Sequence, residues 1–504
     1  MTFRFPVVVL SFTALLGGLI YMLYLLGLVT SANEVYARIC ALSLFVASFL
    51  ILGWQKAKYH RFSWDDIFKN NTLVIVVFTM LLTVMLIRPR TGFYFTGIFI
   101  GVAFLHFLCN RKFYPPPKFF YFVILYALLL FFGTIGTEKG FRFPNKILSF
   151  FLLPLAFCFF RLPQRTLLQI GAVFFRMGIV FLSLCLLYWW FNFLYLDADL
   201  TGWIGGKTAY SAQMTGWDEQ AKTIDRALRG TVGWENISYF SAYFFVTSWS
   251  YFYHPSFVSF VLFFGLITGF YLYHKKNILP TITRFELILY IAFCFIVMLL
   301  MQSRIGIIGL LFIIAVTGLY YLKLKTNYFK IGLAVCLLLG SASFFVLNDK
   351  ISGFTNDETR SAFRSVAISY IQQNFLWGSG YNQQHLALEK EAKKIKDSLP
   401  KTVYPNNSQG RITYVHNQFL GDMVQYGIWG LLALLLMLGT IMYYAVKNRS
   451  YLLQMMVCFL ILFMMIEEPL YVLVGITPTL VFLIFFAAIG ESTKKPKNKT
   501  QAKL

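Results

Sequence analysis

Residues 414–446 read YVHNQFLGDMVQYGIWGLLALLLMLGTIMYYAV and join a polar stretch directly to an apolar run. The part from 426 to 446 carries no charge and matches the length, roughly 17 to 25 residues, that the hydrocarbon core of a bilayer demands. In lipid the backbone groups of such a run are satisfied only within a helix. The stretch therefore predicts a membrane helix, with His416 and Asn417 at the boundary between water and lipid.

The rest of the chain repeats this apolar pattern. Of its 504 residues 58% are hydrophobic and only 13% are charged, which excludes a soluble globular protein. We expect an all-α, polytopic membrane protein, one integral membrane domain over residues 1–504, with about fourteen transmembrane helices in a range of roughly twelve to fifteen. The expected spans lie near residues 5–29, 36–54, 72–87, 91–109, 119–137, 143–160, 167–196, 256–273, 285–301, 305–322, 329–347, 426–446, 450–466 and 470–489.

The net charge of +23 comes from residues whose positions indicate a membrane topology and not a surface that binds nucleic acid. Lys and Arg gather on short loops that successive pairs of spans bring to one side, and such loops mark the cytoplasm. Both termini, including the basic tail 491–504, then lie in the cytoplasm, while the long polar segments 197–255 and 348–425 lie outside. This topology requires that the aromatic piece 237–253 stays in the membrane interface. We expect membrane lipids, and no nucleic acid, as partners.

Segment 348–425, called the cap below, is expected to fold as helices over the membrane surface. Thr355 to Glu358 has the form of a capping box and leads into an amphipathic run. Trp377–Gly378 then ends that helix, and 385–397 indicates a second, charged helix. One face of the first helix carries the apolar side chains Phe363, Val366, Ala367, Tyr370 and Ile371.

His416 is the candidate general base. Deprotonating a hydroxyl needs a group of near-neutral pKa within hydrogen-bond reach, and imidazole meets that need. The alternative is an interfacial histidine that only caps the following helix.

Three arginines suit an anionic ligand. Arg304 stands at the outer mouth between two long apolar runs, where a charge is expensive and indicates function. Its guanidinium can hold phosphate oxygens with two parallel hydrogen bonds, although a snorkelling anchor is the alternative. Arg360 and Arg364, one turn apart in the cap, could form a second anion clamp, and a solvated helix face explains them equally well.

The remaining charged groups carry less information. Glu467 and Glu468, at the outer end of a span, could accept protons or hydrogen-bond a sugar, but they are interpreted as ordinary boundary carboxylates. Arg176 is the one obvious charge deep within a span. The sequence has no phosphate loop of the Walker type and no His-Glu-x-x-His motif, so we expect neither a metal nor a cofactor.

These residues resemble the O-antigen ligase and polymerase superfamily of polytopic bacterial glycosyltransferases. The resemblance covers residues 254 to about 440. It rests on Val415-His416-Asn417-Gln-Phe-Leu420 followed by Tyr426-Gly427-Ile-Trp-Gly430, on Ser303-Arg304-x-Gly306, on an arginine-led helix ending in Trp377-Gly378-Ser-Gly380-Tyr381, and on His254-Pro255-Ser256.

The resemblance implies a glycan donor carried on undecaprenyl pyrophosphate, used without nucleotide sugar or metal at the periplasmic face of the bacterial inner membrane. His416 would activate the acceptor hydroxyl, and Arg304, with Arg360 or Arg364, would stabilise the departing pyrophosphate. The supporting residues implied by the motifs are Asn417, Ser303, Tyr381 and His254.

The first choice of function is an O-antigen ligase with the lipid A core as acceptor, and a direct displacement would invert the anomeric carbon. A polymerase that uses a second lipid-linked glycan as acceptor is the alternative, and a protein glycosyltransferase is third. From another class comes a transporter or flippase of lipid-linked sugars, which needs charges near the bilayer midplane. A structural assembly protein is the remaining possibility.

Overall fold

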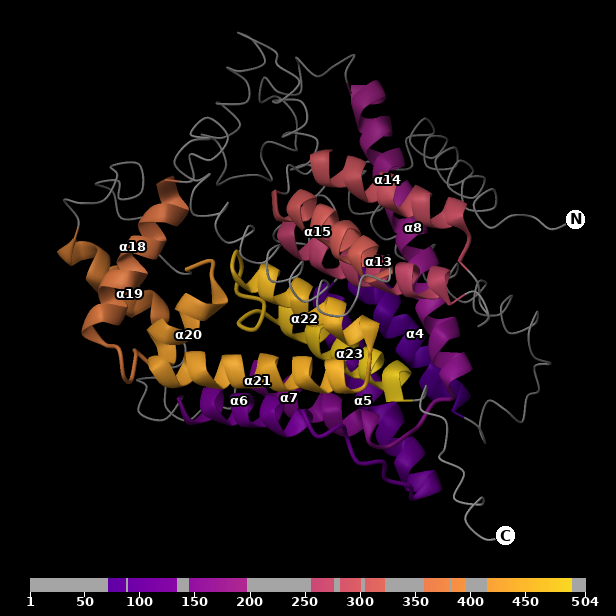
Figure 1. The fold of residues 1–504 in the computed structure, drawn as a ribbon, viewed down its shortest axis with the longest axis horizontal. Coiled ribbons are helices and arrows are strands. Elements are labelled where there is room, and N and C mark those ends of the chain that lie inside the picture. Colours follow the sequence, from indigo (N-terminus) through magenta and orange to yellow (C-terminus); the bar gives the residue numbers. More distant parts are fainter. Residues whose placement is uncertain are drawn as a thin grey trace, which may run out of the picture. The chain divides into compact units, whose positions relative to one another are not determined.

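The structure is a computed structural model, and every described element in it is a helix (Figure 1). The residues that it describes are 71–87, 89–133, 145–196, 255–275, 282–300, 304–321, 358–380, 383–395 and 415–491. By its internal contacts the chain divides into two compact units. Unit 1 comprises Met1–Phe95 and Leu168–Leu310, and unit 2 comprises Thr96–Leu167 and Leu311–Leu504.

Wherever the structure describes an expected span, a helix lies there, so the all-α prediction is confirmed for these residues. The expected spans 5–29, 36–54 and 329–347 lie outside the described residues, as does the piece 237–253. The apolar helices are α4 (Thr72–Ile87), α5 (Pro89–Asn110), α6 (Phe120–Phe132), α7 (Asn145–Phe157), α8 (Gln164–Leu196), α13 (Pro255–His274), α14 (Arg284–Leu300), α15 (Arg304–Tyr321), α21 (Ile428–Lys447), α22 (Tyr451–Met464) and α23 (Leu473–Glu491).

Three of the described helices are long and apolar enough to cross a membrane by length and composition. They are the Gln164–Ser183 part of α8, Ser256–His274 in α13, and α21. In other apolar helices the part that could be compared in this way, such as Phe95–Asn110 of α5 or Gly475–Gly490 of α23, is 10 to 17 residues long, so the total number of spans stays a prediction.

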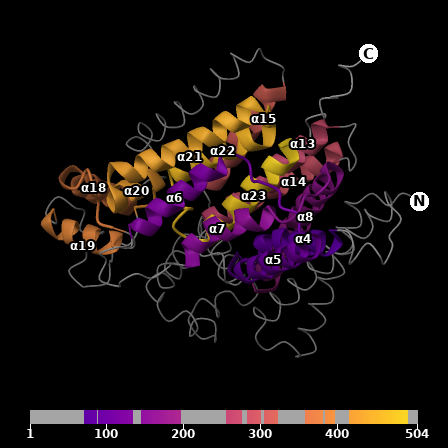
Figure 2. The same cartoon turned by 90° about the horizontal axis from the view of Figure 1, so that it is seen from below.

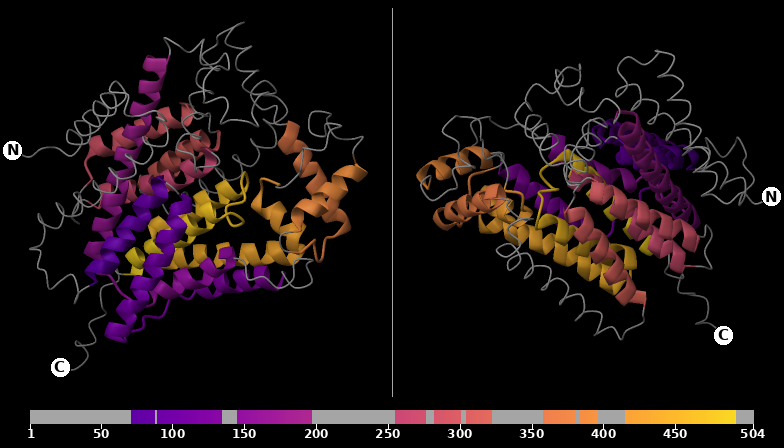
Figure 3. Two further views of the ribbon diagram at one scale, coloured as in Figure 1. Left: turned by 180° about the vertical axis from the view of Figure 1, so that it is seen from behind. Right: turned by 90° about the horizontal axis from the view of Figure 1, so that it is seen from above.

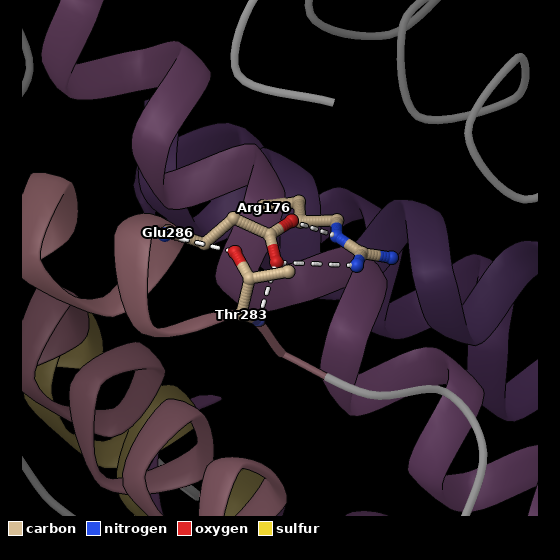
Figure 4. Close-up of polar contacts among 3 residues, drawn as sticks. All are labelled: Arg176, Thr283 and Glu286. Carbon is tan, nitrogen blue, oxygen red and sulfur yellow. Dashed lines mark hydrogen bonds and ion pairs between the residues drawn. The ribbon is translucent and has the colours of Figure 1, made fainter. Parts of the chain in front are cut away.

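Unit 1 holds the charge that the sequence places deep in a span. Arg176 of α8 is buried, and its Nε donates to Glu286 Oε1 at 2.7 Å (Figure 4). Glu286 lies in the first turn of α14, where its second oxygen accepts from the Thr283 N–H at 2.7 Å. The Thr283 hydroxyl accepts from the Glu286 N–H at 3.1 Å, which completes a capping box. The guanidinium is thus neutralised within unit 1, as a buried charge requires.

In unit 2, α6 lies along α21 and α7 lies along α23 (Figures 1 and 2). Two contacts join segments that the expected topology assigns to a common side of the membrane. Gly133, just after α6, packs against the Tyr426 ring ahead of α21, and both belong to the expected outer side. The Tyr114 N–H donates to the Cys158 carbonyl at 2.7 Å, and both belong to the expected inner side.

The cap forms three described helices, α18 (Glu358–Gln373), α19 (Gln384–Lys394) and α20 (Gln418–Tyr426), and α18 and α19 are orange in Figure 3. The apolar face expected on the first of them is confirmed, because Val366, Ala367 and Ile371 are buried against Leu388 of α19 and Val424 of α20. The second helix is also confirmed. The capping box at 355–358 lies outside the described residues except for Glu358.

Gly427 separates α20 from α21 and sits in the left-handed region with φ of +61°. A Cβ there would collide with the backbone carbonyl of Leu376. We expect Gly427→Ala to lower the free energy of unfolding by about 2 kcal/mol or more. The backbone conformation with φ +61° and ψ −151° is one that essentially only glycine adopts, and it alone costs another residue roughly 1–3 kcal/mol. Gly439→Ala is the matched control, since Gly439 lies inside α21 and a methyl group added there would meet open space. Thermal unfolding in detergent measures both, and equal midpoints would contradict the packing described here.

Candidate active site

His416 lies between the buried Val415 and the start of α20, with a left-handed φ of +54°. The residue that caps the N-terminus of α20 is Asn417, whose Oδ1 accepts from the Leu420 N–H at 3.0 Å. The Asn417 amide also donates to the Met465 carbonyl at 3.0 Å, which ties the start of α20 to the end of α22. Because Asn417 performs the capping, the interpretation of His416 as a mere helix cap is wrong.

The imidazole of His416 faces a carboxylate. Its Nδ1 lies 3.3 Å from Glu467 Oε2, and the histidine side chain is 28% exposed while that of Glu467 is 5% exposed. The ring of Phe363 from α18 lies parallel to the imidazole, with centroids 6.2 Å apart. An ionised carboxylate only accepts hydrogen bonds, so Glu467 favours the tautomer with hydrogen on Nδ1. Nε2 then keeps the lone pair that a general base needs.

The neighbouring Glu468 is buried as well. Its Oε1 accepts from the Val415 N–H at 3.1 Å and from Gln384 Nε2 of α19 at 3.2 Å. Burial raises the pKa of Glu468 to about 8, so this carboxyl stays protonated at pH values where an exposed glutamate is charged. The interpretation of Glu467 and Glu468 as ordinary boundary carboxylates is therefore wrong, since both are 4% exposed and bonded to the cap.

Asp422 of α20 forms a second buried polar centre. It accepts from the hydroxyls of Tyr126 and Tyr471 and, at 2.9 Å, from Gln418 Nε2. The Gln418 Oε1 in turn accepts from the Leu470 N–H at 3.0 Å. Burial raises the pKa of Asp422 to about 7, although the hydrogen bonds lower it. These bonds hold α20, α6 and the α22–α23 connection together, and so fix the backbone on both sides of the His416–Glu467 pair.

The arginine-bearing helix packs beside His416. Through Val366 and Val424, α18 joins the same apolar cluster as α20. It carries Arg364, which is half-buried, and Arg360 in its first turn. Arg304 is the first residue of α15. The side chains of Arg304 and Arg360, and all of Ser303, Tyr381 and His254, lie outside the described residues, so their roles stay predictions.

The turn after α18 meets the end of α20. The Ser379 N–H donates to the Val424 carbonyl at 2.8 Å, and the Gly380 N–H donates to the Gln425 carbonyl at 2.7 Å. Gly378 has a φ of +66° and packs on the Gln425 backbone. Two sequence motifs that are far apart in the chain, the Trp-Gly-Ser-Gly turn and the segment after His416, are thus in contact.

The arrangement suits proton transfer from a hydroxyl. A part-exposed imidazole is held by a buried carboxylate, and a helix with two arginines packs alongside. Among the residues that the structure describes, no group of three or more His, Cys, Asp or Glu side chains could hold a metal ion.

Residues 289–435 match the family model described as O-Antigen ligase. The matched range includes Arg304, α18 and the start of α20 with His416. No curated protein matches the chain. The family match confirms the resemblance to the O-antigen ligase and polymerase superfamily. It also supports a function of the ligase or polymerase type, with lipid-linked glycans as substrates and a place in the membrane.

Proposed function

We propose that this chain of the O-antigen ligase and polymerase superfamily is an inverting, metal-independent O-antigen ligase. It moves a glycan from undecaprenyl pyrophosphate to a hydroxyl of the lipid A core at the periplasmic face of the inner membrane. The observation that carries the proposal is the His416–Glu467 pair, 3.3 Å apart, within a chain whose residues 289–435 match the family.

The proposed reaction is a single displacement. His416 Nε2 takes the proton of the acceptor hydroxyl while Glu467 holds the proton on Nδ1. The acceptor oxygen forms a bond to the anomeric carbon, and the bond from that carbon to the pyrophosphate oxygen breaks. Negative charge therefore builds on the undecaprenyl pyrophosphate, where Arg304, with Arg360 or Arg364, supplies the stabilising cations. The proton on His416 then passes to solvent through the exposed side of the ring.

A polymerase is the second candidate, because only the acceptor would differ: a second lipid-linked glycan would take the place of the lipid A core. A protein glycosyltransferase would differ in the same way. The transporter alternative loses support, because Arg176 is paired with Glu286 and does not offer a free charge to a substrate.

The test supplies the purified protein in lipid with donor glycan on undecaprenyl pyrophosphate, together with lipid A core and, separately, a second lipid-linked glycan. Mass spectrometry reports which acceptor gains the mass of the glycan. We expect the lipid A core to gain it. If only the lipid-linked glycan gains mass, the chain is a polymerase and not a ligase. If neither acceptor gains mass but the donor moves across the bilayer, the result favours a flippase.

Glu467→Gln tests the positioning role of the carboxylate. An amide can present either end to Nδ1, so the imidazole loses its preferred tautomer. We expect kcat to fall by about 10² to 10⁴, with little change in KM or in the unfolding temperature. Glu389→Gln is the matched control, since Glu389 pairs with Lys393 on the exposed side of α19 at 3.3 Å. A normal kcat in Glu467→Gln would show that the pair has no role in the reaction.

A further inference from the structure

The turn after α18 exposes an apolar edge of the cap. Phe375, Leu376 and Trp377 are consecutive and have exposed fractions of 48%, 55% and 76%. No charged residue occurs from 375 to 380. An exposed run of this kind in a membrane protein needs an apolar or interfacial partner.

Backbone contacts fix this edge to the start of α21. The Ile428 N–H donates to the Phe375 carbonyl at 2.8 Å, and Gly427 packs directly on the Leu376 backbone. The Trp377 ring lies 6.5 Å from the ring of Trp429, which is in the first turn of α21. The edge therefore cannot move independently of the membrane helix.

The same surface continues along α21. Trp429, Leu432 and Leu436 are spaced three and four residues apart, which places them on one face of the helix, and their exposed fractions are 48%, 50% and 47%. Of the 18-residue apolar stretch of α21, only 33% is buried within the structure. The outward face of this helix is the surface that lipid would cover if α21 spans the membrane.

We propose that Phe375, Leu376, Trp377 and Trp429, together called the Trp patch, bind the boundary between headgroups and acyl chains of the leaflet that α21 enters. Tryptophan favours this boundary because its ring is apolar and its N–H can reach water or headgroups. The patch is continuous with the outward face of α21 and carries no charge. Lipid contact at the Trp patch seats the cap, and hence His416, at a fixed height above the hydrocarbon. This inference does not depend on the glycosyl-transfer chemistry.

The test uses tryptophan fluorescence of the full chain in phosphatidylcholine vesicles. The chain has 10 Trp, so the emission of Trp377 is taken as the difference between the parent protein and Trp377→Phe, a variant that keeps an aromatic ring. We expect phospholipid brominated near the headgroup end of its acyl chains to remove at least about half of this difference emission, as suits an interfacial indole. Phospholipid brominated near the chain terminus should remove less.

Trp429→Phe repeats the measurement at the member of the Trp patch that lies on α21 itself, and the same quenching is expected there. Two results would overturn the proposal. If soluble acrylamide quenches the Trp377 emission and brominated lipid does not, the ring faces water or a glycan. If the emission depends on the protein-to-lipid ratio and not on the brominated lipid, a second copy of the chain covers the patch.

Discussion

Replacing His416 by alanine is expected to slow glycan transfer by a factor of about 10² to 10⁴, the usual contribution of a positioned general base. Without the imidazole the acceptor hydroxyl must lose its proton to water. The donor still binds, because the arginines that would hold its pyrophosphate are untouched. The loss should therefore fall on kcat, measured as the rate of product formation with saturating donor and acceptor.

His385→Ala is the matched control. His385 is a part-exposed histidine of α19 in the same cap, so its removal reproduces the loss of one imidazole without touching Glu467. We expect its kcat to equal that of the parent. Transfer by His416→Ala at the parental rate would remove His416 from the reaction.

Replacing Arg304 by lysine is expected to lower kcat by about 10² to 10³, the range found when one donor to a developing negative charge is lost. Lysine keeps the charge, but a single ammonium cannot reproduce the planar fork of two parallel hydrogen bonds that a pyrophosphate oxygen pair requires. Glycan transfer and donor binding are measured separately, because we expect the substitution to lower the rate of transfer more than the affinity for the donor.

Arg284→Lys provides a close comparison, because Arg284 is the first residue of α14 as Arg304 is the first residue of α15. Arg284 is exposed, and the expected topology puts it on the opposite side of the membrane. Its substitution should leave kcat unchanged. Full activity of Arg304→Lys would show that a point charge suffices and that no guanidinium clamp exists.

The sequence predicts the helical architecture well, because apolar runs and an amphipathic period are local properties. The first two helices of the cap, α18 and α19, lie at the expected places for the same reason, with the buried face through Val366 and Ile371 as anticipated. The break of the first cap helix at Trp377–Gly378 also follows from local conformation. The break between α20 and α21 at Gly427 was not predicted, because the expected span 426–446 runs through it.

The partners of the charged residues could not be predicted, because they depend on contacts between distant segments. Glu467 follows His416 by 51 positions and Glu286 follows Arg176 by 110 positions. One signal was present: a carboxylate beside a long apolar run is costly unless it has a partner. Asn417 carried a second signal, since asparagine is a preferred helix N-cap and histidine is not.

Chemical rescue of His416→Ala by free imidazole tests the proposed base most directly. The parent side chain is 28% exposed, so a small solute can enter the space that the variant leaves. With the variant folded as the parent is, added imidazole is expected to restore transfer in a saturable manner, and to do nothing for Arg304→Lys. A folded His416→Ala variant that stays equally slow at every imidazole concentration would contradict the assignment of His416 as the group that takes the acceptor's proton.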